Sequence, residues 1–215
     1  MGKPRKLVVS FSEVDKDDVA LVGGKGANLG EMLRSGFPVP DGFIVTSVAY
    51  YEFLKENDLA AKIKHLLKTA DFANTESLNQ SSRHIKKYII NGTISDELRK
   101  EVFNHYKKLG GVLKDALVAV RSSATAEDLP TASFAGQQET FLNVKGEANL
   151  IQMIKKAWAS LFESRAIFYR HEKKFDHFKI GIAVPVQKMV ESQTSGVMFT
   201  LDPVTNDKTK IVIEA

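Results

Sequence analysis

Short apolar runs alternate along the chain with longer segments in which apolar residues recur every three or four positions. The short runs are typical of buried strands, whereas the longer period is that of an amphipathic helix. We expect strands at residues 7–11, 42–46, 117–120, 139–144, 182–190, 194–201 and 210–213. We expect helices at residues 27–35, 47–54, 58–67, 83–90, 95–109 and 147–173. Residues 47–109 are therefore mostly helical, and they contain no chemical motif.

Some connections between these elements also follow from the pattern. Ser47 is expected to cap the second helix, and the polar residues 71–82 are interpreted as a loop that leads into a helix. The last three strands are expected to form an antiparallel meander after the long helix at 147–173. Trp158 lies on the apolar stripe of that helix, which favours a position in the core over a cofactor-binding role.

Composition narrows the class of protein. A length of 215 residues suits one large domain or two small lobes, and a hydrophobic fraction of 43% is enough for a core. The net charge of +4 is compatible with a polyphosphate ligand but is too small to indicate nucleic-acid binding. The absence of cysteine excludes disulfides and thiolate chemistry. The N-terminus resembles neither a signal peptide nor a membrane span, so we expect a cytoplasmic protein.

The most informative stretch runs from Leu117 to Val144. Its apolar strand ends at Arg121, and small hydroxyl residues and a loop containing Gly136 follow before the second strand. A loop of small residues lets backbone N–H groups approach an anion, and arginine binds phosphate oxygens in a bidentate way. The residue pattern alone leaves two interpretations open, a phosphate site or a solvated hairpin with a structural arginine.

A second candidate is Lys25, which lies in the glycine-rich stretch 23–26 just before the predicted helix at 27–35. Free N–H groups and the helix dipole favour an anion at such a position. The spacing differs from that of the P-loop, because no Gly-Lys-Ser/Thr follows four variable residues after a glycine. A flexible turn with a solvated lysine is the alternative interpretation.

Near the C-terminus the pattern is less specific. The basic residues at 171–179 are best interpreted as a solvated helix end with cations near the negative pole of the helix dipole. From the pattern alone, Gln187 suits an ordinary strand-edge position and Met189 suits an ordinary core position.

The strings VGGKGANLGEM, RSSATAEDLP, SFAGQQETFLNV and VQKMV change this interpretation. They resemble the nucleotide-binding domain of the phosphoenolpyruvate synthase (pyruvate, water dikinase) family and of the related rifampin phosphotransferases. The resemblance covers residues 22–46, 118–144 and 184–203. It implies an α+β, ATP-grasp-like domain of two lobes, of which the second is incomplete. We expect a first lobe with a helical insert at about 1–112, and the hairpin, long helix and meander at about 113–215.

The resemblance also implies the roles of individual residues. Lys25 and Arg121 would neutralise phosphate charge, and we expect these two residues to be catalytic. Gly136 and the backbone around Gln137 and Gln138 would cover the phosphates as a lid. Thr140 would add a hydroxyl near the nucleotide. Gln187 and Met189 would hold the adenine ring.

The reaction implied by the family passes a phosphoryl group from ATP to a histidine on a separate domain and then to pyruvate. The cofactors are therefore ATP and Mg²⁺, and we expect the metal ligands beyond Ala215. The expected partners are the phosphohistidine and pyruvate-binding domains of a longer chain, with no nucleic acid and no membrane. The five histidines lack the Thr-Ser-His context of the family carrier; they are His65, His84, His105, His171 and His177. This chain alone is accordingly expected to lack dikinase activity.

Two other functions stay open from the sequence. The strings GGKGANL and FTLDPVTND are as similar to rifampin phosphotransferases as to phosphoenolpyruvate synthases, so an antibiotic acceptor is an alternative to pyruvate. Pyruvate phosphate dikinases rank third, because they usually differ more in the central string. A basic, non-catalytic module that binds nucleotide or RNA is the alternative from another class, and salt-dependent RNA retention without any ATP effect would identify it.

Overall fold

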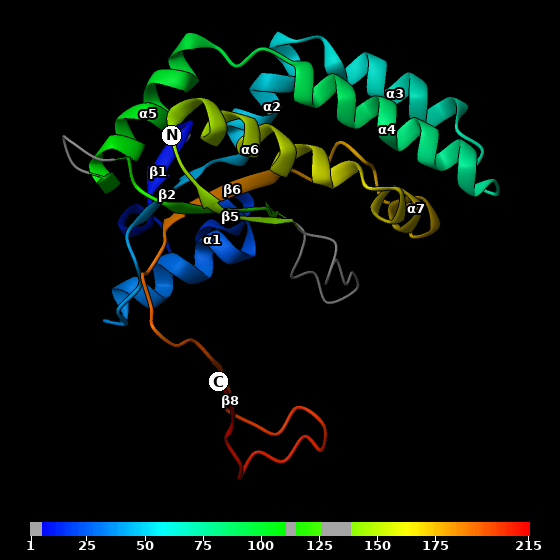
Figure 1. The fold of residues 1–215 in the computed structure, drawn as a ribbon. Helices are drawn as coiled ribbons and strands as arrows, with labels where there is room; N and C mark the ends of the chain where they lie inside the picture. Colours follow the sequence, from blue (N-terminus) through cyan, green and yellow to red (C-terminus); the bar gives the residue numbers. More distant parts are fainter. Residues whose placement is uncertain (1–5, 111–114, 126–138) are drawn as a thin grey trace.

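The computed structural model describes residues 6–110, 115–125 and 139–215. At its centre is an antiparallel sheet with the strand order β1-β2-β6-β3-β5, in which β4 also pairs with β6 (Figure 1). Its strands are β1 (Val8–Ser10), β2 (Gly42–Val45), β3 (Val118–Arg121), β4 (Ser123–Ala124), β5 (Thr140–Val144) and β6 (Ile182–Lys188). The helices are α1 (Val19–Arg34), α2 (Ser47–Glu56), α3 (Leu59–Thr69), α4 (Thr75–Asn91), α5 (Asp96–Gly110), α6 (Glu147–Ala159) and α7 (Ser164–Glu172). The expected mixture of helices and strands in an α+β fold is confirmed.

Helices cover the two faces of the sheet unequally. The larger core lies on one face, where Val120 and Val184 pack with apolar residues of α2 to α6. The smaller core lies on the other face, where Ile44 and Ala183 pack against Val22 of α1. Figure 1 shows α1 on one side of the sheet and α2 to α6 on the other. In the described ranges, no helix is both long and apolar enough to cross a membrane.

The predicted long helix at 147–173 is wrong, because the chain breaks between α6 and α7. A 3-10 turn at Ser160–Phe162 follows α6, and Glu163 is extended at φ −60° and ψ 143°. The buried side chain of Arg170 donates a hydrogen bond of 2.6 Å to the carbonyl of Leu161, which lies in that turn. The apolar stripe hides the break, since Trp158 and Phe162 are both fully buried as the stripe predicts. The prediction that Trp158 is a core residue is confirmed.

The predicted meander is wrong for its first strand, β6, whereas the expected antiparallel pairing of its last two strands is confirmed. β6 lies in the middle of the main sheet, because it pairs with β2 on one side and with β3 on the other. Among the described strands, β7 (Val197–Phe199) pairs with β8 (Val212–Glu214) alone, and this hairpin extends away from the sheet in Figure 1. Its apolar side chains are exposed, and Ile213 is 69% exposed. The pattern identified the strands and the local hairpin, but it did not indicate that β6 lies between β2 and β3.

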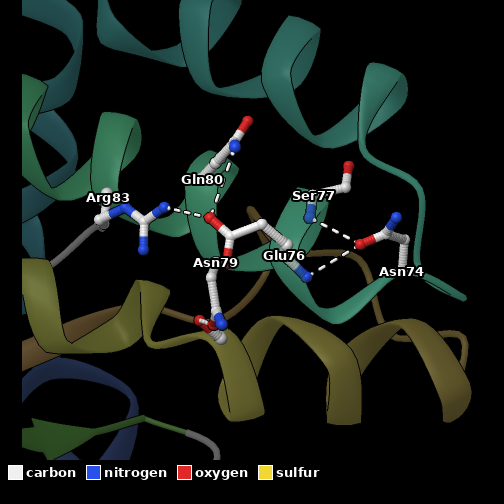
Figure 2. A network of polar contacts seen from close by, with 7 residues as sticks. Asn74, Glu76, Ser77, Asn79, Gln80 and Arg83 are labelled. Carbon is white, nitrogen blue, oxygen red and sulfur yellow. Dashed lines mark hydrogen bonds and ion pairs between the residues drawn. The ribbon is translucent and has the colours of Figure 1, made fainter.

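Helix α2 begins at Ser47 as predicted, but its cap is one residue earlier than expected, and helix α4 begins earlier than predicted because a polar cap precedes it. Thr46 caps α2, since its hydroxyl accepts from the N–H of Ala49, whereas Ser47 donates to the carbonyl of Ala20. Helix α4 begins at Thr75 within the region predicted as a loop. Asn74 Oδ1 accepts from the N–H groups of residues 76 and 77 at 2.9 and 3.1 Å (Figure 2). These bonds satisfy N–H groups that a helix start leaves free, so an asparagine cap was the missed signal.

The interpretation of residues 171–179 as a solvated helix end is wrong for His177. Its Nδ1 accepts a 3.0 Å hydrogen bond from Nε of Arg170, whose side chain is fully buried. Burial lowers the pKa of His177 to about 4, and the positive charge of Arg170 adds to this effect. Burial also lowers the pKa of Arg170, to about 10, so the guanidinium stays charged at neutral pH. His177 is therefore neutral at pH 7 and serves as an acceptor.

This pair gives a prediction about pH. The pKa of His177 is about 4 in the folded chain and near 6.5 in the unfolded chain, so the unfolded chain binds the proton first as the pH falls. We expect the free energy of unfolding to be unaffected by His177 above pH 6.5 and to fall between pH 6.5 and 4. A loss of about 1–2 kcal/mol allows for the partial exposure of the ring. Urea melts across this range measure it.

The matched control is His177→Asn, which keeps an acceptor for Arg170 but does not titrate. The difference in stability between the unaltered chain and this variant should shrink as the pH falls from 6.5 to 4. A difference that is constant over that range would show that His177 does not carry the pH dependence.

Candidate functional site

Lys25 is positioned by an interruption of α1. Gly23 has φ 67° and ψ 170°, so α1 consists of two helical segments, and Lys25 lies at the start of the second. The helix therefore begins at Val19, earlier than the predicted Ala27. A side chain at Gly23 would meet Ser123, since an added Cβ would lie 2.4 Å from its carbonyl oxygen. The Lys25 N–H donates a 3.1 Å hydrogen bond to Oγ of Ser123. The glycine turn is thus docked directly on β4.

Arg121 is the last residue of β3 and lies two positions before Ser123. It is half-buried, and in the sheet it pairs with Thr140 at the start of β5. The backbone of Lys25 is therefore hydrogen-bonded to a residue two positions from Arg121, although the two cations are 96 residues apart in the sequence. The fold brings the two predicted phosphate-binding segments to the same end of the sheet.

Strand alternation assigns the predicted site residues to one face. Val118 and Val120 belong to the larger core, so Ala119 and Arg121 face the other way, toward the side that carries α1. Ala119 pairs with Gln187, and Arg121 pairs with Thr140, so all four share this face. Ser123 lies on the same face, since its strand partner Ala183 packs against α1.

Among the described elements, helix α1 covers this face over β2, β4 and β6. Among the described residues, the side chains of this face are more exposed toward the end of β3 and on β5, whereas Ala119 is buried. Thr140 is exposed, Leu142 is 58% exposed, and Arg121 and Gln187 are half-buried. A ligand that lay across β3 and β5 would have one end near the second segment of α1, which follows Gly23.

The other end of this face is formed by the residues around the end of β6. The side-chain NH₂ of Gln187 donates to the carbonyl of Pro40 at 3.3 Å, and the N–H of Met189 donates to the carbonyl of Leu117 at 2.8 Å. β6 ends at Lys188 rather than at the predicted Val190. Met189 lies opposite Leu117, four residues from Arg121, which corresponds to roughly 13 Å along a strand. An extended ligand is needed to reach both ends.

The chain matches, over residues 19–215, the family described as pyruvate phosphate dikinase, AMP/ATP-binding domain. It belongs to this family. A probable phosphoenolpyruvate synthase of Staphylothermus marinus is 50% identical over 217 residues, covering 99% of this chain and 26% of the relative. That of Archaeoglobus fulgidus is 52% identical over 209 residues, covering 97% and 28%. The phosphoenolpyruvate synthase of Aeropyrum pernix is 49% identical over 214 residues, covering 98% and 26%. The chain thus spans about a quarter of the length of these curated relatives.

Membership of the dikinase AMP/ATP-binding family confirms the resemblance drawn from the sequence strings. Some of the predicted site residues cannot be compared with the structure, because Gly136, Gln137 and Gln138 lie outside the described residues. Across the described ranges, no group of three or more His, Cys, Asp or Glu side chains could hold a metal ion.

One ionisable residue near the site was missed by the sequence analysis. Burial raises the pKa of the Glu139 carboxyl, and the negative charge of Glu163 raises it further. Glu139 lines a hollow of about 270 Å³ together with Phe141, which packs on the larger core. This hollow therefore opens toward the helices α4 and α6, away from the face that carries Arg121. The sequence signal was weak, because a single glutamate before a strand has no distinctive pattern.

Proposed function

We propose that this chain is the ATP-binding part of a dikinase that transfers a phosphoryl group from ATP to a histidine on a separate domain and on to pyruvate, giving phosphoenolpyruvate. The observation that carries the proposal is the gathering of Arg121, Thr140 and Gln187 on one sheet face, with the Lys25 segment docked beside Arg121. The AMP/ATP-binding description of the family and the names of the relatives support it. A rifampin phosphotransferase would use the same ATP site with another acceptor.

The proposed fold is an ATP-grasp-like one, in which two lobes hold the nucleotide. We infer that the main sheet and its helices form one lobe and that the β7–β8 hairpin belongs to the second. The exposed apolar residues of this hairpin support the inference, since Val197 and Ile213 are both more than half exposed.

The proposed roles follow from the chemistry of phosphoryl transfer, in which charge spreads over the oxygens of the transferring group. Lys25 and Arg121 would neutralise that charge, and N–H groups at the start of the second segment of α1 other than that of Lys25, which is bonded to Ser123, would add donors. Thr140 would contribute its hydroxyl, and residues 136–138 would close over the phosphates. Gln187 and Met189, at the far end of the face, would hold the adenine ring.

Magnesium, when bound, would neutralise phosphate charge during the transfer. The described residues do not form a site for it, since they provide no suitable cluster of His, Cys, Asp or Glu side chains.

The test is a titration of this chain with ATP, followed by its melting temperature. Binding to the folded state alone stabilises it by RT ln(1 + [L]/Kd), which is about 2.7 kcal/mol at a hundredfold excess over Kd. We expect ATP to raise the melting temperature, and we expect Lys25→Met to weaken ATP binding about tenfold, equivalent to about 1.4 kcal/mol.

The control is Lys64→Met, which removes an exposed lysine from α3 on the other side of the sheet. This variant should bind ATP as the unaltered chain does. Equal losses in the two lysine variants would indicate a nonspecific charge effect, and salt-dependent RNA retention without an ATP shift would favour the binding-module alternative.

A further inference from the structure

The hydroxyl residues that follow Arg121 form hydrogen bonds with other segments of the protein. Ser122 donates through its N–H and its hydroxyl to the carbonyl of Glu139, at 3.0 and 3.2 Å. Ser123 accepts from the N–H of Lys25 at 3.1 Å. Thr125 accepts from the N–H of Gly181 at 3.0 Å through its side chain. Each hydroxyl therefore ties this short stretch to a different segment.

Two of these ties end on segments that carry proposed ligand residues. Ser122 holds the residue before Thr140, and Ser123 holds Lys25 itself. The third tie ends at Gly181, which precedes β6 and has no proposed role in binding. Ser122 and Ser123 are 1% and 0% exposed, so both hydroxyls are buried inside the protein. This burial argues against an alternative role for them as phosphate ligands.

We propose that Ser123 is a positioning residue, which holds Lys25 close to Arg121 so that both cations bind the same phosphate chain. The proposal rests on the proposed function and deepens it. Ser123 and the glycine turn also lie in close contact. Only a residue without a side chain fits at Gly23, because an added Cβ would clash with Ser123. Ser122 has the parallel role for Thr140.

The physical argument is one of preorganisation. A lysine whose backbone is not held in place samples many positions. A ligand that binds such a lysine must first order it, and this ordering lowers the affinity. A buried hydrogen bond from the lysine backbone to β4 fixes the start of the side chain before the ligand arrives. Removing the hydroxyl should therefore weaken binding only through Lys25.

A double-mutant cycle distinguishes this role from a general effect on folding. Calorimetric titration of the chain with ATP should show about a tenfold loss of affinity for Ser123→Ala. In a Lys25→Met background, the same substitution should change affinity less than twofold. Thr125→Ala is the matched control, since it removes a hydroxyl tie from the same stretch and should leave ATP affinity within twofold. Equal losses for Ser123→Ala in the two backgrounds would overturn the proposal.

A second measurement needs no ligand. Amide hydrogen exchange at Lys25 should become at least tenfold faster in Ser123→Ala, whereas Thr125→Ala should leave that amide unchanged. An unchanged exchange rate of the Lys25 amide in Ser123→Ala would show that the Ser123 hydroxyl does not hold Lys25. If the unaltered chain fails to bind ATP, the proposed function fails, and the exchange measurement still decides whether Ser123 holds Lys25.

Ser122→Ala is the alternative variant if Ser123→Ala does not fold. It keeps the 3.0 Å backbone bond to Glu139, so the hairpin retains a tie at this point. We expect about a threefold loss of ATP affinity that disappears in a Thr140→Val background. An equal loss with and without the threonine hydroxyl would exclude the positioning role of Ser122.

Discussion

Replacing Gly23 with alanine is expected to lower the free energy of unfolding by at least about 3 kcal/mol and to remove the stabilisation by ATP. Two independent effects add at this position. The backbone has φ 67° and ψ 170°, a region that is nearly restricted to glycine. The new Cβ would also lie 2.2 Å from Oγ and 2.4 Å from the carbonyl oxygen of Ser123, so the turn must leave β4. Denaturant melts and an ATP titration measure the two losses.

Gly36 provides the matched control for this substitution. It also has a positive φ, of 82°, but an added Cβ would find nothing within 4 Å. Gly36→Ala should therefore show the cost of the left-handed backbone alone, about 1 kcal/mol, with unchanged ATP binding. If both glycine variants lost the same stability, the close approach to Ser123 would have no measurable effect, and the docking of the turn would not depend on Gly23.

Local features of the fold were predictable from the sequence because they depend on neighbouring residues. The apolar runs predicted the bounds of β2 and β3 to within one residue. The spacing of apolar residues along one face predicted helix α5. The paired strands β3 and β5 were expected as one hairpin unit and are found as such. The breaks were missed where the cause is tertiary. Arg170 reaches the turn after α6 only in the folded chain, and no periodicity records that contact.

The candidate site was predictable in part for the same reason. The strings around Lys25 and Arg121 identified the family, but spacing does not determine which strand lies beside which. The position of β6 between β2 and β3 is what puts Gln187 on the same face as Arg121. The buried roles of Ser122 and Ser123 could not be predicted either, since a hydroxyl in a small-residue loop is equally compatible with a ligand contact and an internal tie.

Replacing Arg121 with alanine is expected to abolish the rise in melting temperature caused by ATP while the unliganded fold is retained. A guanidinium binds phosphate oxygens through two parallel hydrogen bonds, and hydrogen bonds to charged groups contribute about 1.5–3 kcal/mol each. The loss of one such pair corresponds to a weakening of at least about a hundredfold. Stability without ATP should change little, because Arg121 lies at the end of β3 with its side chain half-buried. Thermal melts with and without ATP measure both effects.

Two variants make this expectation specific to the guanidinium. Arg121→Lys keeps the positive charge but lacks the planar fork, so it should bind ATP with an affinity between those of the alanine variant and the unaltered chain. Arg83→Ala removes an exposed arginine whose partner is Glu76, at 2.7 Å on α4, and should leave the ATP shift unchanged (Figure 2). An ATP shift that persists in Arg121→Ala would place the phosphates elsewhere. In that case the shared face of β3, β5 and β6 would not be the nucleotide site, and the family match alone would not restore that assignment.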